Sequence, residues 1–507
     1  MSLVFRNWGV QKNNYIRTGV SQVLARMNYG STISHLRRCV IPIGKEGKNA
    51  KIRQTHPSQI MYLCPNECFD PNTPILLWNG AIKMAKDIIV GDYLIDDNGN
   101  PTRVKTTCSG FTTMYEVQQE KKNFMNYTVT DNHILTLKIK NHKKIRKEKK
   151  KYRLHWFDKS KLNHISKIFE TFEDAENYNK SILEDDILDI TIEKYLKLNT
   201  KERSQLYGFK TKEINWEKKL VKLDPYILGM WLGDGLSSGY GFVTADEILL
   251  EYWKKWAKEN NIDIKKHKKY QYGLSSTLNN NQPILENGKD KKGRDIKKNR
   301  PEKAIFLNIL KEYNLVNNKH IPKDFLINDR ETRLKILAGI IDTDGSVRAN
   351  GHEIRICQGP NNIQIILDTL FLAQSLGFSC HLNDGISQWS HKFKDGRTEK
   401  RFSKYKELTI TGELLYEIPT LLVRKKLNNF ILKNSISRCT SFLQTPIQVV
   451  KKDFAPFVGW QLEGNGRFLL SDFTVVHNTP KFIGRVIPKV LLVCYNRQHN
   501  QIAGKSC

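Results

Sequence analysis

The sequence predicts a mixed fold in which an all-β domain is split by an inserted α+β domain with two repeats. Short β-branched runs that end in turn signals occur near residue 70 and again near residue 470. Between them, two apolar helical runs end in Asp-Gly, at Asp234 and Asp344, about 110 residues apart. Strands at both ends with a repeated helix between them indicate one domain interrupted by another.

Composition limits the class of protein. The chain has 507 residues with 39% apolar side chains, enough for roughly three or four domains. A net charge of +30 favours a polyanionic partner, most simply nucleic acid, although a solvated basic surface is the alternative. Nine scattered cysteines without paired zinc spacing indicate reduced thiols in a cytoplasmic or nuclear protein. Neither a signal peptide nor a membrane-spanning run is found, so we expect no secretion and no membrane partner.

Residues 1–67 are basic and too short to bury a core of their own. Four runs within them resemble the second-largest subunit of eukaryotic-type DNA-directed RNA polymerase: Arg17–Leu24, Ser34–Arg38, Ile43–Lys48 and Arg53–His56. The similarity breaks off after Glu67 and resumes, briefly, at Thr479-Pro480. Residues 1–67 and 479–507 are therefore expected to be host flanks, and the resemblance implies other RNA polymerase subunits as their partners. Neither flank carries polymerase catalytic residues, so we expect no RNA synthesis by this chain alone.

The segment after residue 68 has β character. A strand run enters the Asn79-Gly80 turn, a second precedes Asp96–Gly99, and a third covers Tyr127–Leu137. A basic run, Lys138–Arg153, follows and ends among aromatic residues. It is either a solvated loop or a DNA contact. Residues 186–198 predict a strand followed by a helix.

From about residue 224 the pattern becomes helical. Helices are predicted at 226–235, 247–261 and 333–345, with β segments after each repeat at 241–244 and 352–358. The polar stretch 289–303 predicts a loop. After residue 429 the β character returns and continues to His477.

The two repeated helices carry the residues expected to cut DNA. Small residues four apart, Gly229/Gly233 and Gly339/Thr343, allow two helices to approach closely. Such a pair delivers Asp234 and Asp344 to one place, where the carboxylates repel each other unless they bind a cation such as Mg²⁺. A single Leu-Gly-Asp-Gly would more simply be a helix end, but two copies in a basic chain favour a metal-dependent nuclease.

This half, residues 222–430, resembles the LAGLIDADG homing endonucleases in Ile227–Gly235 and Leu337–Gly345. The resemblance implies Mg²⁺ held by the two aspartates, and a double-stranded DNA target. The family's Lys-x-Ile-Pro element is matched by Lys319–Pro322, which implies a catalytic role for Lys319. A second lysine is expected from the other half, with Lys404 and Lys425 as candidates.

The end of the β region carries a different chemistry, in Val475-Val-His477-Asn478-Thr479. An asparagine amide can attack its own carbonyl and cut the chain, with His477 supplying a proton. The Thr479 hydroxyl and the Cys68 thiol can both accept an acyl group. Cys68 also lies where the host similarity breaks off.

Residues 68–478 resemble an intein with a Hedgehog/intein (HINT) fold, divided into 68–215, which includes the basic DNA-contacting insertion, and 436–478. The resemblance implies that Thr130 orients the scissile peptide bond and that His133 protonates its nitrogen. Gly459 and Gly466 depart from the family, which often has an aspartate and a polar residue there. Splicing would need no cofactor, because each step is an intramolecular acyl transfer.

We therefore expect a self-splicing intein with an inserted homing endonuclease in an RNA polymerase subunit. Three alternatives stay open. The nuclease could have decayed, the domain could cleave without ligating, or the chain could be a non-catalytic DNA-binding subunit fragment of a transcription complex.

Overall fold

The computed structural model describes residues 27–28, 68–140, 143–148, 151–159, 162–182, 186–276, 305–348, 353–392, 398–427 and 442–478. The chain divides into two compact units, Met1–Ile60 and Met61–Cys507, and the helices and strands described belong to the second. The host flanks, apart from residues 27–28, lie outside the described residues, as do Glu67, Thr479 and the loop expected at 289–303. No helix in the described ranges is long and apolar enough to cross a bilayer.

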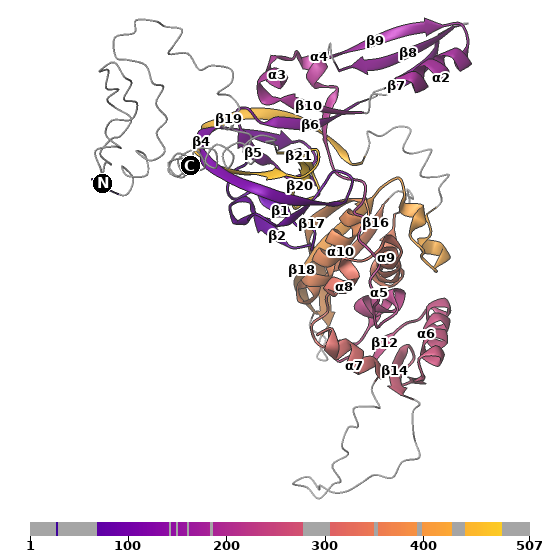
Figure 1. Ribbon diagram of the computed structural model, residues 1–507. Helices are drawn as coiled ribbons and strands as arrows, with labels where there is room; N and C mark the ends of the chain where they lie inside the picture. The colour runs from indigo at the N-terminus through magenta and orange to yellow at the C-terminus, as the bar shows by residue number, and fades with distance from the viewer. Residues whose placement is uncertain are drawn as a thin grey trace, which may run out of the picture. The chain divides into compact units, whose positions relative to one another are not determined.

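A seven-stranded antiparallel sheet forms the β domain. Its strands run in the order β10-β6-β11-β19-β4-β3, with β5 also paired to β4. They are β3 (Tyr93–Ile95), β4 (Pro101–Gln119), β5 (Tyr127–Thr130), β6 (Ile134–Ile139), β10 (Ile187–Thr191), β11 (Leu206–Phe209) and β19 (Gln444–Leu462). Figure 1 shows β4 and β19 as two long curved strands side by side, although they are far apart in sequence. The predicted β domain is therefore built from both ends of the segment.

Two short hairpins close this domain, β1 (Pro74–Leu76) with β2 (Ile82–Met84), and β20 (Arg467–Leu469) with β21 (Val475–His477). Ile75, Phe468 and Val476 from these hairpins join the sheet in one core around Phe69, whereas Leu76, Leu469 and Val475 belong to a neighbouring cluster. The Phe69 ring stacks on Trp460 with centroids 6.1 Å apart and meets Phe468 edge-on at 5.4 Å. Burial of such large rings is the main force that holds the first and last strands together.

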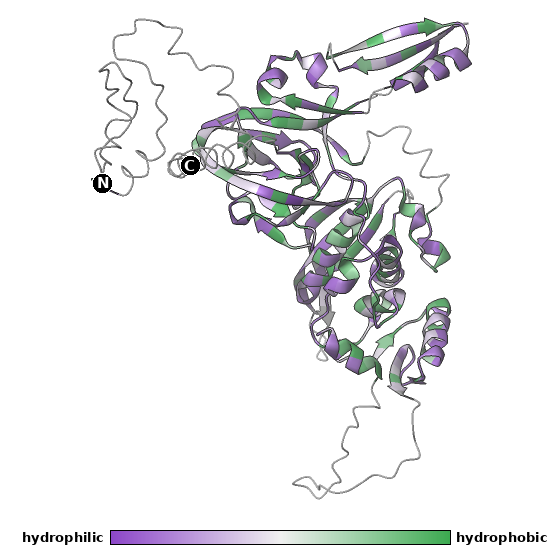
Figure 2. Ribbon diagram, in the orientation of Figure 1, coloured by the Kyte–Doolittle hydropathy of each residue, from purple (hydrophilic) through white to green (hydrophobic). Residues whose placement is uncertain are grey.

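Most of the basic run is strand, so its interpretation as a loop is wrong. Three antiparallel strands, β7 (Lys143–Glu148), β8 (Lys151–Asp158) and β9 (Asn163–Phe169), pack on α2 (Phe172–Ser181). Leu154 and Phe157 are buried. Figure 2 shows that α2 is mostly hydrophilic. The next elements are the short helices α3 (Ile192–Lys197) and α4 (Thr200–Arg203).

The α+β part has two halves, each beginning with a long helix. In the first half, α5 (Pro225–Asp234) is followed by β12 (Gly241–Val243), α6 (Glu247–Glu259), β13 (Ile262–Lys266) and β14 (Gln271–Ser276). Helices α7 (Ile305–Glu312) and α8 (Lys323–Leu326) connect it to the second half. That half contains α9 (Arg330–Asp344), β15 (Gly345–Val347), β16 (Ile354–Gln358), α10 (Ile363–Ser375), β17 (Ser379–Lys392) and β18 (Thr398–Thr411). The helices predicted at the two Asp-Gly sequences are confirmed.

Helices α5 and α9 pack against each other through glycine. A Cβ added to Gly339 would lie 2.4 Å from the Tyr226 carbonyl oxygen and 2.9 Å from the Gly229 Cα. A Cβ on Gly229 would lie 2.3 Å from the Ile336 carbonyl oxygen. Each helix starts at a capping aspartate, Asp224 or Asp329. The spacing of small residues therefore serves close backbone contact, as predicted.

Gly339→Ala is expected to destabilise the protein by about 3 kcal/mol, because the new methyl group overlaps the backbone of α5. This effect outweighs the roughly 1 kcal/mol by which alanine favours a helix over glycine. Thermal unfolding followed by circular dichroism measures it, in a chain that also carries Cys68→Ala and Asn478→Ala to prevent self-processing. Gly359→Ala is the control, because nothing lies within 4 Å of that site. Equal melting temperatures for the two variants would contradict the close packing.

Both insertions leave the main sheet from paired strands. The basic insertion departs after β6 and returns at β10, where Lys138 pairs with Ile187. The α+β part departs after β11 and returns at β19, where Phe209 pairs with Gln444. The main sheet therefore stays continuous across both interruptions. The α+β part has its own hydrophobic core, which shares no residue with the core around Phe69.

Candidate functional site

Cys68 is held by its backbone between β5 and β19. Its amide N–H donates to the Thr130 hydroxyl oxygen at 3.0 Å, and its carbonyl accepts from the Thr130 N–H at 3.0 Å. The next residue, Phe69, exchanges two hydrogen bonds of 2.8 and 2.9 Å with Val458. The nitrogen bonded to Thr130 belongs to the peptide bond between residues 67 and 68. Thr130 is therefore in a position to orient that bond.

His133 lies beside this junction in an apolar setting. Its ring meets Phe69 edge-on with centroids 4.7 Å apart, and it is 1% exposed. Neither ring nitrogen has a hydrogen-bond partner within the described residues. Burial, with a smaller effect from His477, lowers the pKa of His133 well below its usual 6.5. The imidazole is therefore neutral at pH 7 and free to exchange a proton with a reacting group.

This burial predicts an acid-sensitive fold. Below pH 6.5 the unfolded chain binds a proton at His133 that the folded chain does not. The contribution of neutral His133 to the free energy of unfolding is therefore fully present above pH 6.5 and is lost as the pH falls. The loss approaches about 1.4 kcal/mol per pH unit from this residue. Amide exchange of β6 at pH 7.5 and 5.5, in the chain carrying Cys68→Ala and Asn478→Ala, measures it. His133→Gln should reduce the slope by this residue's share, with the share of buried His477 remaining, and His381→Gln, at a partly exposed position, should leave the slope unchanged. An unchanged slope in His133→Gln would contradict the prediction.

Asn478 follows β21 and is also buried. Its N–H donates to the Gly466 carbonyl oxygen at 2.8 Å, which fixes the backbone. Its side-chain oxygen and nitrogen are buried without a hydrogen-bond partner in the described part of the chain. An unpaired buried amide is costly, so it points to a group reserved for reaction. His477 is buried as well, and burial lowers its pKa.

The backbone conformation at residue 466 explains why the chain has glycine where the family often has a polar residue. It has a φ of +82°, and a Cβ there would lie 2.7 Å from the Asn478 carbonyl oxygen and 3.3 Å from the His477 ring. A larger residue does not fit this backbone. Gly459, the other departure, lies directly opposite Cys108 on β4.

Asp234 and Asp344 end the two packed helices. A Cβ on Gly233 would lie 3.3 Å from the Asp344 carboxyl carbon, so the two helix ends are in contact. Burial raises the pKa of Asp234 to about 6, and the charge of Asp344 adds to this shift. Burial also raises the pKa of Asp344, whose carboxylate accepts a 2.6 Å hydrogen bond from the Gln358 side chain. Gln358 was not predicted, because no spacing rule distinguishes a functional glutamine on β16.

Two lysines contact the helix ends that carry Asp234 and Asp344, and they make the same kind of hydrogen bond. The Lys319 ammonium donates to the carbonyls of Leu232, Gly233 and Gly235 at 3.0, 3.3 and 2.7 Å. Burial lowers the Lys319 pKa to about 8.

The Lys425 ammonium donates to the carbonyls of Ile341, Asp342 and Thr343 at 2.8, 2.7 and 3.1 Å. It caps the end of α9 as Lys319 caps α5. The alternative candidate, Lys404, is exposed on β18, where it pairs with Ile386. Lys425 is therefore the counterpart of Lys319.

The residues that hold Lys425 were missed by sequence analysis. Asp342, two residues before the end of α9, is buried and accepts hydrogen bonds from the Leu421 and Leu422 N–H groups at 2.7 and 3.3 Å. Asp368 on α10 does the same for the other lysine, since it accepts from the Ile321 N–H at 2.8 Å. Each lysine segment is thus fixed by a carboxylate.

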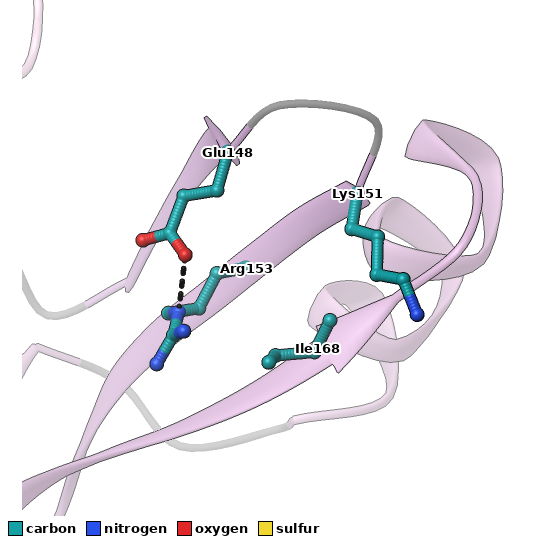
Figure 3. A pocket seen from close by; sticks show the side chains of 4 residues that line it. All are labelled: Glu148, Lys151, Arg153 and Ile168. Carbon is teal, nitrogen blue, oxygen red and sulfur yellow. Dashed lines mark hydrogen bonds and ion pairs between the residues drawn. The ribbon is translucent and has the colours of Figure 1, made fainter.

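A surface hollow lies elsewhere, on the basic insertion. Figure 3 shows it lined by Glu148, Lys151, Arg153 and Ile168, with a 2.9 Å ion pair between Arg153 and Glu148. It contains none of the predicted site residues. Because Glu148 offsets charge from Lys151 and Arg153, the hollow has no concentrated positive charge. It also has no group suited to catalysis.

Comparison with known proteins bears on two parts of the chain. Residues 68–218 match the family model described as Hom_end-associated Hint. They form a Hint domain, which indicates autocatalytic protein splicing of the intein type. The match includes Cys68, Thr130 and His133 and ends before α5. Residues 22–72 match RNA polymerase Rpb2, domain 3.

Curated relatives match the N-terminal region. The chain is 64% identical over 62 residues to a probable DNA-directed RNA polymerase II subunit RPB2 homolog of Invertebrate iridescent virus 6, which covers 12% of this chain and 5% of the relative. It is 56% identical over 66 residues to DNA-directed RNA polymerase II subunit 2 of Arabidopsis thaliana, covering 13% and 6%. The predicted resemblance to this polymerase subunit is confirmed for this region, and the chain spans only about a twentieth of each relative.

Proposed function

We propose that residues 68–478 excise themselves from the chain and join Glu67 to Thr479. The observation that carries this proposal is the convergence of both ends of the segment around Phe69. Cys68 precedes Phe69, the His133 ring lies 4.7 Å from it, and Phe468, paired with β21, lies at 5.4 Å. Groups held this close react as if at very high concentration.

The splicing steps follow from the chemistry of the groups. The Cys68 thiol gives its proton to the neutral His133 imidazole as its sulfur attacks the Glu67 carbonyl. The C–N bond then breaks, and His133 passes that proton to the departing nitrogen. The Thr479 oxygen then attacks this thioester, which forms an ester and releases the Cys68 thiol. The Asn478 side-chain nitrogen attacks its own carbonyl, closes a succinimide and frees the Thr479 amine, with His477 as proton donor. That amine displaces the ester oxygen and completes a peptide bond. No cofactor enters these steps.

Intact-mass analysis of the purified chain tests this function. The wild type should yield residues 68–478 and the joined flank, whereas a Cys68→Ala, Asn478→Ala double variant should keep its full mass. Separate flanks would support cleavage without ligation, the competing function. A wild-type chain that stays intact in reducing buffer would refute self-processing and favour a non-catalytic DNA-binding subunit fragment.

The α+β part is proposed to be a homing endonuclease that cuts double-stranded DNA. Support comes from the paired carboxylates, Asp234 and Asp344, and from the matching approach of Lys319 and Lys425. The lysines would neutralise phosphate charge, and the lowered pKa of Lys319 eases its release of a proton. The net charge of +30 and the basic insertion fit a DNA partner.

The donor set fits Mg²⁺. The described residues contain no group of three or more metal-ligating side chains, so Asp234 and Asp344 would bind the ion with water and phosphate oxygens completing its shell. Mg²⁺ characteristically retains such ligands. When bound, it would activate water and stabilise the leaving oxygen of a phosphodiester. Both aspartates must then be ionised, which a cation favours and their mutual repulsion opposes.

Plasmid cleavage tests the nuclease. The Cys68→Ala, Asn478→Ala chain is incubated with a plasmid carrying the uninterrupted host sequence around codons 67 and 479, and with one carrying the interrupted gene. We expect linear product from the first plasmid only, and only with Mg²⁺. Uncut uninterrupted plasmid would favour a splicing-only intein with a decayed nuclease.

The flanks are assigned to the host. We propose that the joined flank belongs to the second-largest subunit of an RNA polymerase and binds other polymerase subunits, in the cytoplasm or nucleus where the template DNA lies. Polymerase activity itself is not assigned to this chain.

A further inference from the structure

A second thiol lies next to Cys68. The Cys108 sulfur on β4 is 3.6 Å from the Cys68 sulfur. Cys68 is fully buried and Cys108 is half-buried, so one member of the pair is accessible to a small solute. The two residues are 40 positions apart, and they carry no disulfide.

The fold brings the two sulfurs together from both sides. Cys68 is fixed by its two hydrogen bonds to Thr130, and Phe69 by its pair with Val458 on β19. The next residue on β19 is Gly459, directly opposite Cys108. Because cross-strand partners share one face of a sheet, a side chain at 459 would compete for the space beside Cys108. The glycine leaves that space to the two thiols, which pack with Met114 and Phe457.

We propose that Cys68 and Cys108 form a reversible disulfide that keeps the chain unspliced under oxidising conditions. The inference rests on the proposed splicing function, since a Cys68 sulfur bonded to another sulfur cannot attack the Glu67 carbonyl. Two sulfurs 3.6 Å apart need only small side-chain rotations to reach bonding distance.

Glutathione disulfide is the oxidant in this reaction. The more exposed Cys108 thiolate attacks it, which gives a mixed disulfide at Cys108 and one reduced glutathione. The Cys68 thiolate then attacks the Cys108 sulfur and releases a second reduced glutathione. In sum, two thiols lose two hydrogens, and glutathione disulfide gains them. Reduction by a dithiol reverses both steps and returns Cys68 to splicing.

The other described cysteines have no such arrangement. The Cys380 sulfur is buried and contacts the Phe378 carbonyl, and the Cys357 sulfur contacts Glu407. Neither has a sulfur neighbour within the described residues. Cys357 is exposed, which makes it a suitable control for general thiol oxidation.

The first experiment looks for the bond without splicing. A full-length chain carrying Asn478→Ala and Thr479→Ala is exposed to glutathione disulfide, alkylated and digested without reductant. A peptide pair joined through Cys68 and Cys108 is expected. Cys68 linked instead to glutathione or to another cysteine would overturn the proposal.

The second experiment asks whether the bond controls splicing. The wild-type chain and the Cys108→Ser and Cys357→Ser variants are made by cell-free translation in reduced or oxidised glutathione buffer. We expect wild type and Cys357→Ser to splice at least ~10-fold more slowly in the oxidised buffer, and to recover with dithiothreitol. Because the ratio of disulfide to dithiol changes about tenfold for each ~30 mV, a graded buffer series should give a sharp midpoint.

Cys108→Ser should splice at one rate in both buffers. Equal arrest of Cys108→Ser and wild type would overturn the proposal, because oxidation would then act elsewhere. Splicing of Cys108→Ser in reduced buffer also shows that the variant folds, and Cys108→Ala serves as a second variant. Should the wild type fail to splice even in reduced buffer while the cross-link forms, the splicing function would be refuted and the disulfide itself retained.

Discussion

Asp344→Asn is expected to lower DNA cleavage by at least about a thousandfold while DNA binding stays within a few-fold of the parent chain. The reason is geometric. The Asp344 carboxylate is fixed by Gln358 at 2.6 Å beside the end of α5, and an amide of the same shape cannot neutralise a divalent cation. Plasmid cleavage and gel-shift binding, both in the Cys68→Ala, Asn478→Ala chain, measure the two effects.

Asp234→Asn should lose cleavage in the same way and, in addition, raise the melting temperature of the metal-free protein at pH 7. Burial raises the pKa of Asp234 to about 6 from its unfolded value near 4. The folded state therefore binds the proton more tightly, and stability is lost as the pH rises from about 4 to 6 and remains lost at pH 7. The neutral amide avoids this loss.

Asp246→Asn is the matched control. Asp246 precedes α6 and pairs with Arg424 at 2.8 Å, outside the two helix ends. It should keep cleavage activity. If Asp234→Asn or Asp344→Asn cuts DNA at the parental rate, the two aspartates are not the site. Lost cleavage with a lower melting temperature in Asp234→Asn would instead indicate damage to the fold.

Asn478→Ala is expected to slow release of the C-terminal flank more than about a thousandfold, because no other group can close the succinimide ring. The Asn478 amide is buried and has no hydrogen-bond partner among the described residues, and the backbone N–H is fixed to Gly466 at 2.8 Å. Added thiol should still cut this variant after Glu67, since the Cys68 thioester can form. The Cys68→Ala chain should resist that cut.

Mass spectrometry of the cleaved chains separates the two effects. Asn361→Ala, at an exposed position beside α10, should splice as the parent does. Release of the C-terminal flank from Asn478→Ala at the parental rate would rule out cyclisation at this residue. Thiol cleavage of Cys68→Ala would rule out the thioester at Cys68.

Much of the architecture could be predicted from sequence. The helices that end at Asp234 and Asp344 have long apolar runs, and the glycines within them have a spacing that only close packing requires. Strands near residues 70 and 470 could be assigned to one domain because both ends had the same turn-rich pattern. Asn478 was predicted from the His-Asn-Thr sequence, Cys68 from the point where the host similarity breaks off, and His133 from the resemblance to inteins. The fold brings Cys68 and His133 beside one aromatic ring, Phe69. Their roles stay predictions.

Other features could not be predicted, for physical reasons. Lys425 binds main-chain carbonyls, which every residue has, so no side-chain pattern distinguishes it from Lys404. The strands β7 and β8 are so rich in lysine and arginine that alternation is hidden, and their packing on α2 decides the fold. The approach of Cys108 to Cys68 depends on strand register, which places Cys108 opposite Gly459.

Each insertion begins and ends on two strands that pair with each other, so each is a removable module. At Phe209 and Gln444, and again at Lys138 and Ile187, the chain leaves and re-enters the sheet between neighbouring strands. A tight hairpin turn could therefore replace either insertion without changing the order of the strands. For the strand order, gain or loss of the α+β segment is a change in loop length, and loss also removes the Ile327 and Phe371 side chains that pack with Leu76 and Phe473. Such loops tolerate great variation in length, since closure entropy grows only slowly with it.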